Sequence, residues 1–171
     1  RRRGLAQARQ GFNAMSVRQI DIFDKSGLIE FDARRLRAFV RALDDLLPEN
    51  MKAPRGTLSL AFFDDADIAK IHADFMNKPD PTDVITFEGD AEDDFAGEVC
   101  ASAETALKCA ERYSNTPSAE LCLYVAHGYL HLAGIDDIAP EDALKMRAAE
   151  AEAMKILKAK FRKPIFKFKQ K

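Results

Sequence analysis

The segment from Leu121 to Asp137 constrains the chain most, because it places two histidines in a stretch that is otherwise apolar. Between Leu121 and Leu132 the apolar side chains leave no clearly polar face at the helical period, so we expect a buried helix. His127 and His131 stand four residues apart, which puts both imidazoles on one face of that helix. Burying each imidazole without a partner would cost about 1–3 kcal/mol, and a bound cation would remove that cost.

A glycine and an acidic residue follow the second histidine at the spacing of a ligand-bearing turn. Gly134 stands where a helix can end in a left-handed conformation, which lets the chain fold back across the histidines. Asp137 is then in register to be a third metal ligand, with Asp136 as the alternative. This order of residues resembles the metal-binding helix and turn of the metzincins. The histidines could instead pack in the core without metal, but the spacing of Gly134 and Asp137 would then be coincidence.

One position departs from the zinc-peptidase pattern. A peptidase of that kind carries a general-base glutamate directly after its first histidine, whereas this chain has Gly128. Glycine neither accepts a proton nor orients a water molecule. We therefore expect the ligand frame of a metal-dependent hydrolase, and a zinc metallopeptidase is the disfavoured alternative.

The composition indicates one folded domain in a reducing compartment. A chain of 171 residues, with 47% hydrophobic and 32% charged residues and a net charge of -2, is neither wholly disordered nor strongly basic. Any nucleic-acid binding must therefore come from local basic patches. The sequence has no run of about 18 apolar residues, so no membrane span is expected. The three widely spaced cysteines are expected to be reduced core thiols, which fits the cytoplasm.

Hydrophobic periodicity predicts an α+β fold. Strands are expected at residues 16–23, 57–63, 83–87 and 96–102, and helices at residues 33–47, 65–77, 103–113, 117–132 and 140–160. Because strands dominate the first half and helices the second, we expect a single domain with helices packed on a mixed four-stranded sheet. The metal site would lie on a buried helix in the C-terminal half, as in zincins. The acidic segment 88–94 is interpreted as a solvated hairpin loop.

Both ends of the chain are basic. We expect the domain to span residues 15–161, with a flexible extension at 1–14 and a basic tail at 162–171. The extension has four arginines and no acid and precedes Met15, so we interpret it as an upstream start, with an organellar presequence as the disfavoured alternative. Residues 155–171 hold eight basic residues and no acid, interleaved with three phenylalanines. Such a tail is typical of nucleic-acid binding and equally of a disordered, solubilising end.

Several blocks resemble the YbeY family of metal-dependent endoribonucleases, which are bacterial rRNA maturation factors. The blocks are residues 127–137, residues 78–87, residues 97–99, and Met146 with Glu150. The resemblance implies a single-metal endoribonuclease acting in rRNA maturation and ribosome quality control, with Zn²⁺ as cofactor. It implies His127, His131 and Asp137 as metal ligands, with rRNA and the small ribosomal subunit as partners. It also implies a cytoplasmic protein with no DNA or membrane partner.

Two positions depart from the family pattern. The signature usually ends in histidine, whereas Asp137 is anionic and would make a bound ion a weaker Lewis acid. An arginine usual in the family is Met76 here, so the nearby Lys78 is the candidate for binding phosphate, as a point charge without a planar fork. The expected catalytic residues are thus His127, His131 and Lys78. The alternative function is a ribosome-associated RNA-binding factor that has a structural metal and little catalysis.

Overall fold

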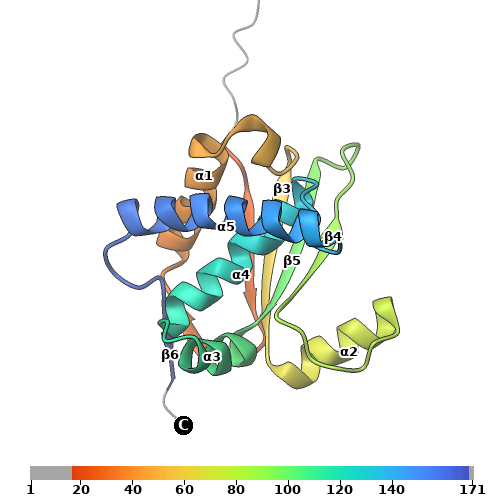
Figure 1. Ribbon diagram of the computed structural model, residues 1–171, viewed down its shortest axis with the longest axis vertical. Coiled ribbons are helices and arrows are strands. Elements are labelled where there is room, and N and C mark those ends of the chain that lie inside the picture. Colours follow the sequence, from red (N-terminus) through yellow and green to blue (C-terminus); the bar gives the residue numbers. More distant parts are fainter. Residues whose placement is uncertain (1–16, 170–171) are drawn as a thin grey trace, which may run out of the picture.

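A four-stranded mixed sheet lies at the centre of the molecule (Figure 1). The computed structural model describes residues 17–169. In chain order the elements are β1 (Ile20–Asp24), β2 (Ile29–Phe31), α1 (Ala33–Leu46), the 3-10 turn η1 (Glu49–Met51), β3 (Thr57–Phe63), α2 (Asp65–Met76), β4 (Val84–Glu88), β5 (Phe95–Ser102), α3 (Ala103–Arg112), α4 (Pro117–Leu132), α5 (Pro140–Lys160) and β6 (Phe166–Phe168). The predicted α+β class and mixed four-stranded sheet are confirmed.

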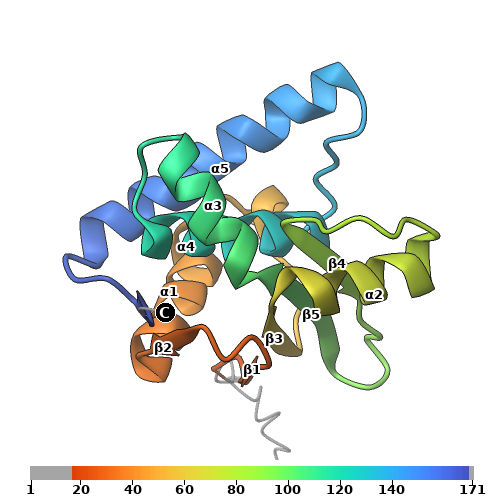
Figure 2. The ribbon, with the colours of Figure 1, turned by 90° about the horizontal axis from the view of Figure 1, so that it is seen from below.

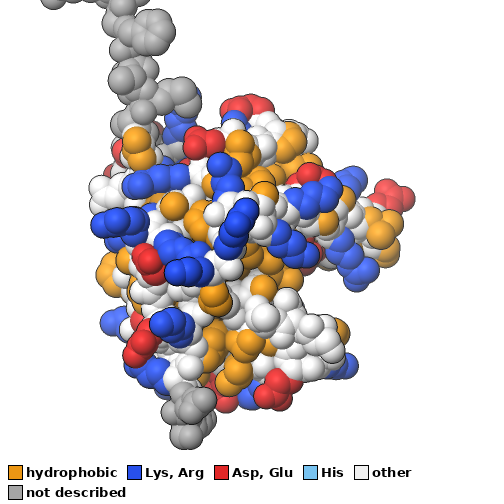
Figure 3. Space-filling view, turned by 90° about the vertical axis from the view of Figure 1, so that its left-hand side faces the viewer, with side chains coloured by type: hydrophobic (Ala, Val, Ile, Leu, Met, Phe, Trp, Pro, Cys, Tyr) orange, Lys and Arg blue, Asp and Glu red, His pale blue; other side chains and the backbone are white. Residues whose placement is uncertain are grey.

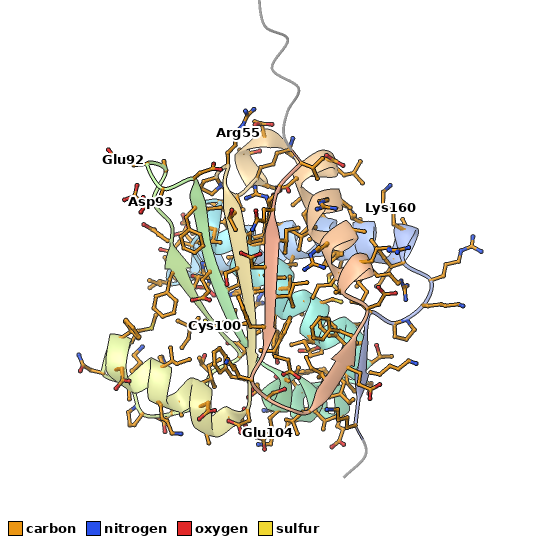
Figure 4. All side chains as sticks on the ribbon, turned by 180° about the vertical axis from the view of Figure 1, so that it is seen from behind. Arg55, Glu92, Asp93, Cys100, Glu104 and Lys160 are labelled. Carbon is orange, nitrogen blue, oxygen red and sulfur yellow. The ribbon has the colours of Figure 1, made fainter. Side chains whose placement is uncertain are left out.

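The sheet has the strand order β1-β3-β5-β4. β1 pairs with β3 and β3 with β5 in parallel, whereas β4 pairs with β5 antiparallel. Parallel neighbours need long crossover connections, and α1 and α2 lie in those connections. β4 and β5 form the hairpin expected around the acidic segment, with Glu92 and Asp93 at its tip (Figure 4).

Helices cover both faces of the sheet. α4 packs on the face formed by residues such as Leu60 and Val99, and α5 crosses the outer side of α4 (Figures 1 and 2). α2 lies against the opposite face, where Ile68 packs with Ile85 and Cys100. The resulting order of layers is α5, α4 with α1, the sheet, and α2. α4 is therefore buried between the sheet and α5.

The end of the described chain is folded, which corrects the expected boundary at residue 161. β6 pairs antiparallel with β2, and Ile165 and Phe166 are each 2% exposed. The backbone N–H groups of both residues donate to the hydroxyl of Ser118 on α4, at 3.2 and 3.1 Å. The ring of Phe166 also contacts that of Phe62 on β3, with centroids 5.2 Å apart. Residues 162–169 thus belong to the domain, because their alternating apolar residues complete its core.

Other differences are local. The first strand begins at Ile20, later than predicted, and the three-residue β2 was not predicted because its partner lies more than 130 residues away. Cys100 and Cys122 are buried and Cys109 is half-buried, and none of the three is in a disulfide. The expected extension at residues 1–14 lies outside the described residues. Between residues 17 and 169 no helix is long and apolar enough to cross a membrane.

Candidate metal centre

The two histidines lie on the one open face of α4. Thr116 caps the helix by accepting a hydrogen bond from the N–H of Ala119 at 3.2 Å, and Pro117 occupies the first turn, as predicted. Most of the helix is buried, but the side chains of His127 and His131 are 15% and 24% exposed. The helix is therefore buried as predicted, whereas the imidazoles themselves are partly open to solvent. This exposure gives a substrate access to them.

The structure brings His127, His131 and Asp137 together. The two Nε2 atoms are 2.9 Å apart. One carboxylate oxygen of Asp137 lies 3.5 Å from Nε2 of His127, and the other lies 3.7 Å from Nε2 of His131. One potential ligand atom from each residue lies within 4.8 Å of the other two. Three protein ligands at one point are the usual set of a catalytic zinc site.

The turn after α4 explains how Asp137 reaches the histidines. Gly134 has φ +86°, which glycine adopts without the strain that a Cβ would cause. The N–H of Gly134 donates to the carbonyl of His131 at 2.9 Å, and that of Ile135 donates to the carbonyl of Leu130 at 3.1 Å. This pair of bonds is a Schellman motif, which ends the helix and reverses the chain.

The neighbouring Asp136 forms hydrogen bonds within the turn. Its carboxylate accepts hydrogen bonds from the N–H groups of Asp137, at 2.7 Å, and Ile138, at 3.2 Å. These bonds shape the turn and engage Oδ1 of Asp136, whose carboxylate is not in the three-residue cluster. The geometry therefore favours Asp137 over Asp136, in agreement with the register argument from the sequence.

The outer nitrogens of both imidazoles face acceptors. Nδ1 of His127 lies 2.6 Å from Oε1 of Glu150 on α5, and Nδ1 of His131 lies 2.9 Å from the carbonyl oxygen of Ile135. Because a carboxylate and a carbonyl only accept, each Nδ1 is the donor and each neutral ring keeps its lone pair on Nε2. Two lone pairs and the Asp137 carboxylate then converge with no donor among them. Such an arrangement fits a cation.

The protonation behaviour of the two rings differs. Burial disfavours the charged form of His127, but the hydrogen bond and charge of Glu150, with the charges of Asp83 and Asp137, outweigh it and raise its pKa. Burial and the neighbouring His127 lower the pKa of His131. Without metal, the carboxylate of Glu150 therefore favours the protonated form of His127. A metal ion at this place competes with that proton, so its affinity falls as the pH falls.

Gly128 is fixed by packing against the sheet. A Cβ at this position would lie 2.5 Å from Cγ1 of Val99 and 3.2 Å from Cγ2 of Thr86. The position that carries the general base in zinc peptidases therefore faces β4 and β5 and has no room for a side chain. This contact gives a structural reason for the missing glutamate.

Tyr129 anchors the same helix from the other side. It is fully buried, and its hydroxyl donates to Asp44 of α1 at 2.8 Å. Asp44 also accepts two bonds from the guanidinium of Arg18, each 2.8 Å long. The network gives the buried hydroxyl a partner and ties α4 to α1. The sequence offered no signal for it, because Arg18, Asp44 and Tyr129 are far apart along the chain.

Lys78 is not part of the three-residue cluster. It is exposed in the loop after α2, and within residues 17–169 no side-chain hydrogen bond or ion pair joins it to the histidines or to Asp137. Met76 is 45% exposed at the end of α2. This end of α2 lies away from α4 in Figure 1, on the opposite side of β4. Any role of Lys78 therefore depends on a substrate that extends across the β4 edge.

Glu150 and Asp83 are site residues that spacing alone did not reveal. Glu150 was noted only through the family resemblance, and it stands 23 residues beyond His127. The charge of Asp83, which directly precedes β4, contributes to the raised pKa of His127. Both come from elements whose packing on α4 is a tertiary property. No periodicity in the chain points to either residue.

Comparisons with known proteins point to one family. The model of a family described as "Endoribonuclease YbeY" matches residues 21–158. A protein of that name from Rhodopirellula baltica is 44% identical over 106 residues, which cover 60% of this chain and 55% of that protein. Proteins of the same name from Protochlamydia amoebophila and Thermobifida fusca are 35% and 30% identical, covering 68% and 79% of this chain and 82% and 91% of theirs.

A solved structure shares the fold. The solution structure of TM1509 from Thermotoga maritima superposes with a TM-score of 0.58 and 23% sequence identity. The alignment covers 84% of this chain and 92% of that one. At this identity the likeness shows the common fold alone.

Proposed function

Because the chain belongs to the endoribonuclease YbeY family, we propose that it is a single-metal endoribonuclease acting in rRNA maturation and ribosome quality control. The observation that carries the proposal is the convergence of two imidazole lone pairs and one carboxylate. His127, His131 and Asp137 would hold the ion. Their donor set, two nitrogens and one oxygen, suits Zn²⁺, although other divalent transition metals accept the same ligands.

When bound, the ion would supply Lewis acidity for a phosphoryl oxygen and a water molecule that ionises near neutral pH. The residues around the ion would determine its Lewis acidity and the pKa of that water molecule. Glu150 accepts from His127 and holds that ring with Nε2 towards the ligand point. Asp137 adds a negative charge, which keeps the pKa of the water on the high side. The partial exposure of both histidines leaves room for the phosphate of an RNA chain.

Lys78 would act as an electrostatic partner of the RNA backbone. Its ammonium group is exposed in the loop that leads into β4. Because a lysine is a point charge on a flexible stem, it would attract phosphate without the bidentate geometry of an arginine. We therefore propose catalysis by His127 and His131 with weaker assistance from Lys78. The expected partners are rRNA and the small ribosomal subunit in the cytoplasm.

A second candidate function is a ribosome-associated RNA-binding factor with a structural metal and little catalysis. Met76 and the position of α2 on the opposite face of the sheet favour it, because among residues 17–169 no arginine is hydrogen-bonded or ion-paired with His127, His131 or Asp137. A metallopeptidase is disfavoured because Gly128 packs against Val99.

Cleavage of structured rRNA fragments by purified protein, supplied with zinc, manganese or magnesium, tests the proposal. We expect endonucleolytic products that disappear on chelation and in the His131→Ala variant. If metal-replete wild type binds rRNA but cuts no fragment with any of the three ions, the non-catalytic ribosome factor replaces the nuclease. Metal-dependent proteolysis of casein would revive the peptidase.

A further inference from the structure

The charges of the chain are segregated in sequence and in space. All 28 acidic residues lie between Asp21 and Glu152, whereas residues 155–169 carry seven basic residues and no acid. The seven are exposed on the last turns of α5, the following loop and β6; they are Lys155, Lys158, Lys160, Arg162, Lys163, Lys167 and Lys169, and we call them the basic face. Figure 3 shows lysine and arginine side chains gathered on this side of the molecule. In Figure 4, Lys160 lies on the opposite side from Glu92 and Asp93.

The aromatic residues interleaved with these charges point inward. The ring of Phe161 contacts that of Phe39 with centroids 5.9 Å apart, and Phe166 is buried against Phe62. The residues of the basic face therefore present cations without an exposed aromatic ring among them. Proteins that bind single strands combine basic grooves with rings on which bases stack. A ligand of the basic face is thus recognised by its phosphates and not by its bases.

The side chains of the basic face extend from ordered elements and make few hydrogen bonds or ion pairs within the chain. Lys155 pairs with Glu152 at 2.5 Å, and Lys169 donates to the carbonyl of Gly27 at 3.1 Å. Among the described residues no ion pair engages the other five. Arg35 of α1 donates to the carbonyl oxygens of Lys163 and Pro164, which holds the loop in place. The basic face is therefore preorganised, and its charges remain available to an anion.

The basic face and the metal centre share α5. Glu150, the partner of His127, lies on the same helix as Lys155 and Lys160. At a rise of 1.5 Å per residue these lysines lie about 8–15 Å further along the helix axis. That distance is only a few base pairs of an A-form RNA helix. An RNA helix on the basic face therefore has phosphates within reach of the metal centre.

We propose that the basic face binds the phosphate backbone of double-helical RNA, independently of its sequence, and holds a structured substrate beside the metal centre. This inference rests on the proposed function. Charge complementarity supports it, since residues 21–152 hold all 28 acidic residues against 13 basic ones and so repel a polyanion. A membrane surface fits less well, because the apolar residues of this segment are turned into the core.

Two charge-matched triple variants test the proposal. Lys158, Lys163 and Lys167 are replaced by Gln in one variant, and Arg55, Lys70 and Arg112, which are exposed elsewhere, are replaced by Gln in the other. Binding of a 20-base-pair RNA duplex is measured by fluorescence anisotropy in chelator at several salt concentrations. The absence of metal prevents cleavage, so the assay reports binding alone.

The basic-face variant should bind about ten- to a hundredfold more weakly at 0.1 M salt, and the slope of log K against log[salt] should fall by about three. The control variant should bind nearly as the wild type does. Equal losses in the two variants would overturn the proposal, as would binding to phosphatidylserine vesicles that exceeds binding to RNA. A change in affinity that depends on the duplex sequence would also contradict it.

A second substrate separates this inference from the nuclease proposal. A single-stranded oligonucleotide of about six residues is too short to occupy both the metal centre and the basic face. Its cleavage should be unchanged in the basic-face variant, whereas cleavage of a structured rRNA fragment should show a raised KM. If the wild type cuts neither substrate but the duplex-binding result holds, the nuclease proposal fails and the basic face stands.

Discussion

Replacing Glu150 by Gln removes one negative charge from the metal centre and little else. The carboxylate lies 2.6 Å from Nδ1 of His127, and the amide oxygen of glutamine can accept the same hydrogen bond. Loss of a carboxylate partner of this kind typically lowers metal affinity ten- to a hundredfold, or about 1.4–2.7 kcal/mol. Glu152→Gln is the matched control, because Glu152 lies on the same helix and pairs only with Lys155 at the surface.

The pH of the measurement decides how the result is interpreted. Glu150 raises the pKa of His127, so the variant should lower that pKa and weaken the competition between proton and metal. At low pH this weaker competition from protons partly offsets the affinity lost with the carboxylate. Above the raised pKa of His127 the ring is neutral and the offset disappears. Titration against a competing chelator at about pH 8 therefore measures the effect of the charge alone.

Metal affinity falls as the pH falls, whereas the stability of the metal-free protein should gain a contribution from His127 as the pH falls. A raised pKa in the folded state stabilises the protein below the unfolded value, near 6.5, and this contribution disappears as the pH rises through the folded value. Denaturation of the metal-free protein should therefore show a pH dependence in this window that Glu150→Gln reduces. Metal affinity equal to that of the wild type, with the pH dependence unchanged, would refute the assigned role of Glu150.

Three further predictions concern single positions. Asp137→His should retain metal and shift the acidic limb of the cleavage profile to lower pH, because a neutral ligand leaves more charge on the ion; an unmoved limb would show that Asp137 is no ligand. Gly128→Ala should destabilise the fold by about 1–3 kcal/mol in urea unfolding, because its Cβ would meet Val99 at 2.5 Å; wild-type stability would mean that β5 and α4 are further apart. Met76→Arg should lower the KM for structured RNA more than it changes turnover, because the end of α2 lies away from the metal centre and a guanidinium there would meet only flanking phosphates; a large rise in turnover with KM unchanged would show that residue 76 reaches the scissile phosphate.

Short-range sequence signals made much of α4 predictable. Thr116 and Pro117 mark its start, Gly134 its end, and the four-residue spacing of the histidines places both rings on one face. These signals act within a few residues, so they can be recognised without knowledge of the tertiary structure. The partner of Nδ1 of His127 cannot, because Glu150 reaches this atom only through the packing of α5 on α4.

The C-terminal segment shows the limit of reasoning from charge. Eight basic residues without an acid are typical of a tail, yet Phe166 and Ile165 fill the core and β6 pairs with β2. A strand of three residues gains its stability from a partner that lies far away in the chain, so its own pattern is weak. Truncation after Phe161 would for this reason remove part of the core along with the charges.

X-ray absorption of the zinc-loaded protein tests the central claim most directly, because it reports the atoms around the ion. We predict one zinc per chain with two imidazole nitrogens at about 2.0–2.1 Å and further oxygen ligands at about 2.0–2.2 Å. His127→Ala should lose one imidazole from this shell and most of its metal. A substoichiometric ion, a shell without imidazole, or full occupancy in His127→Ala would contradict the account.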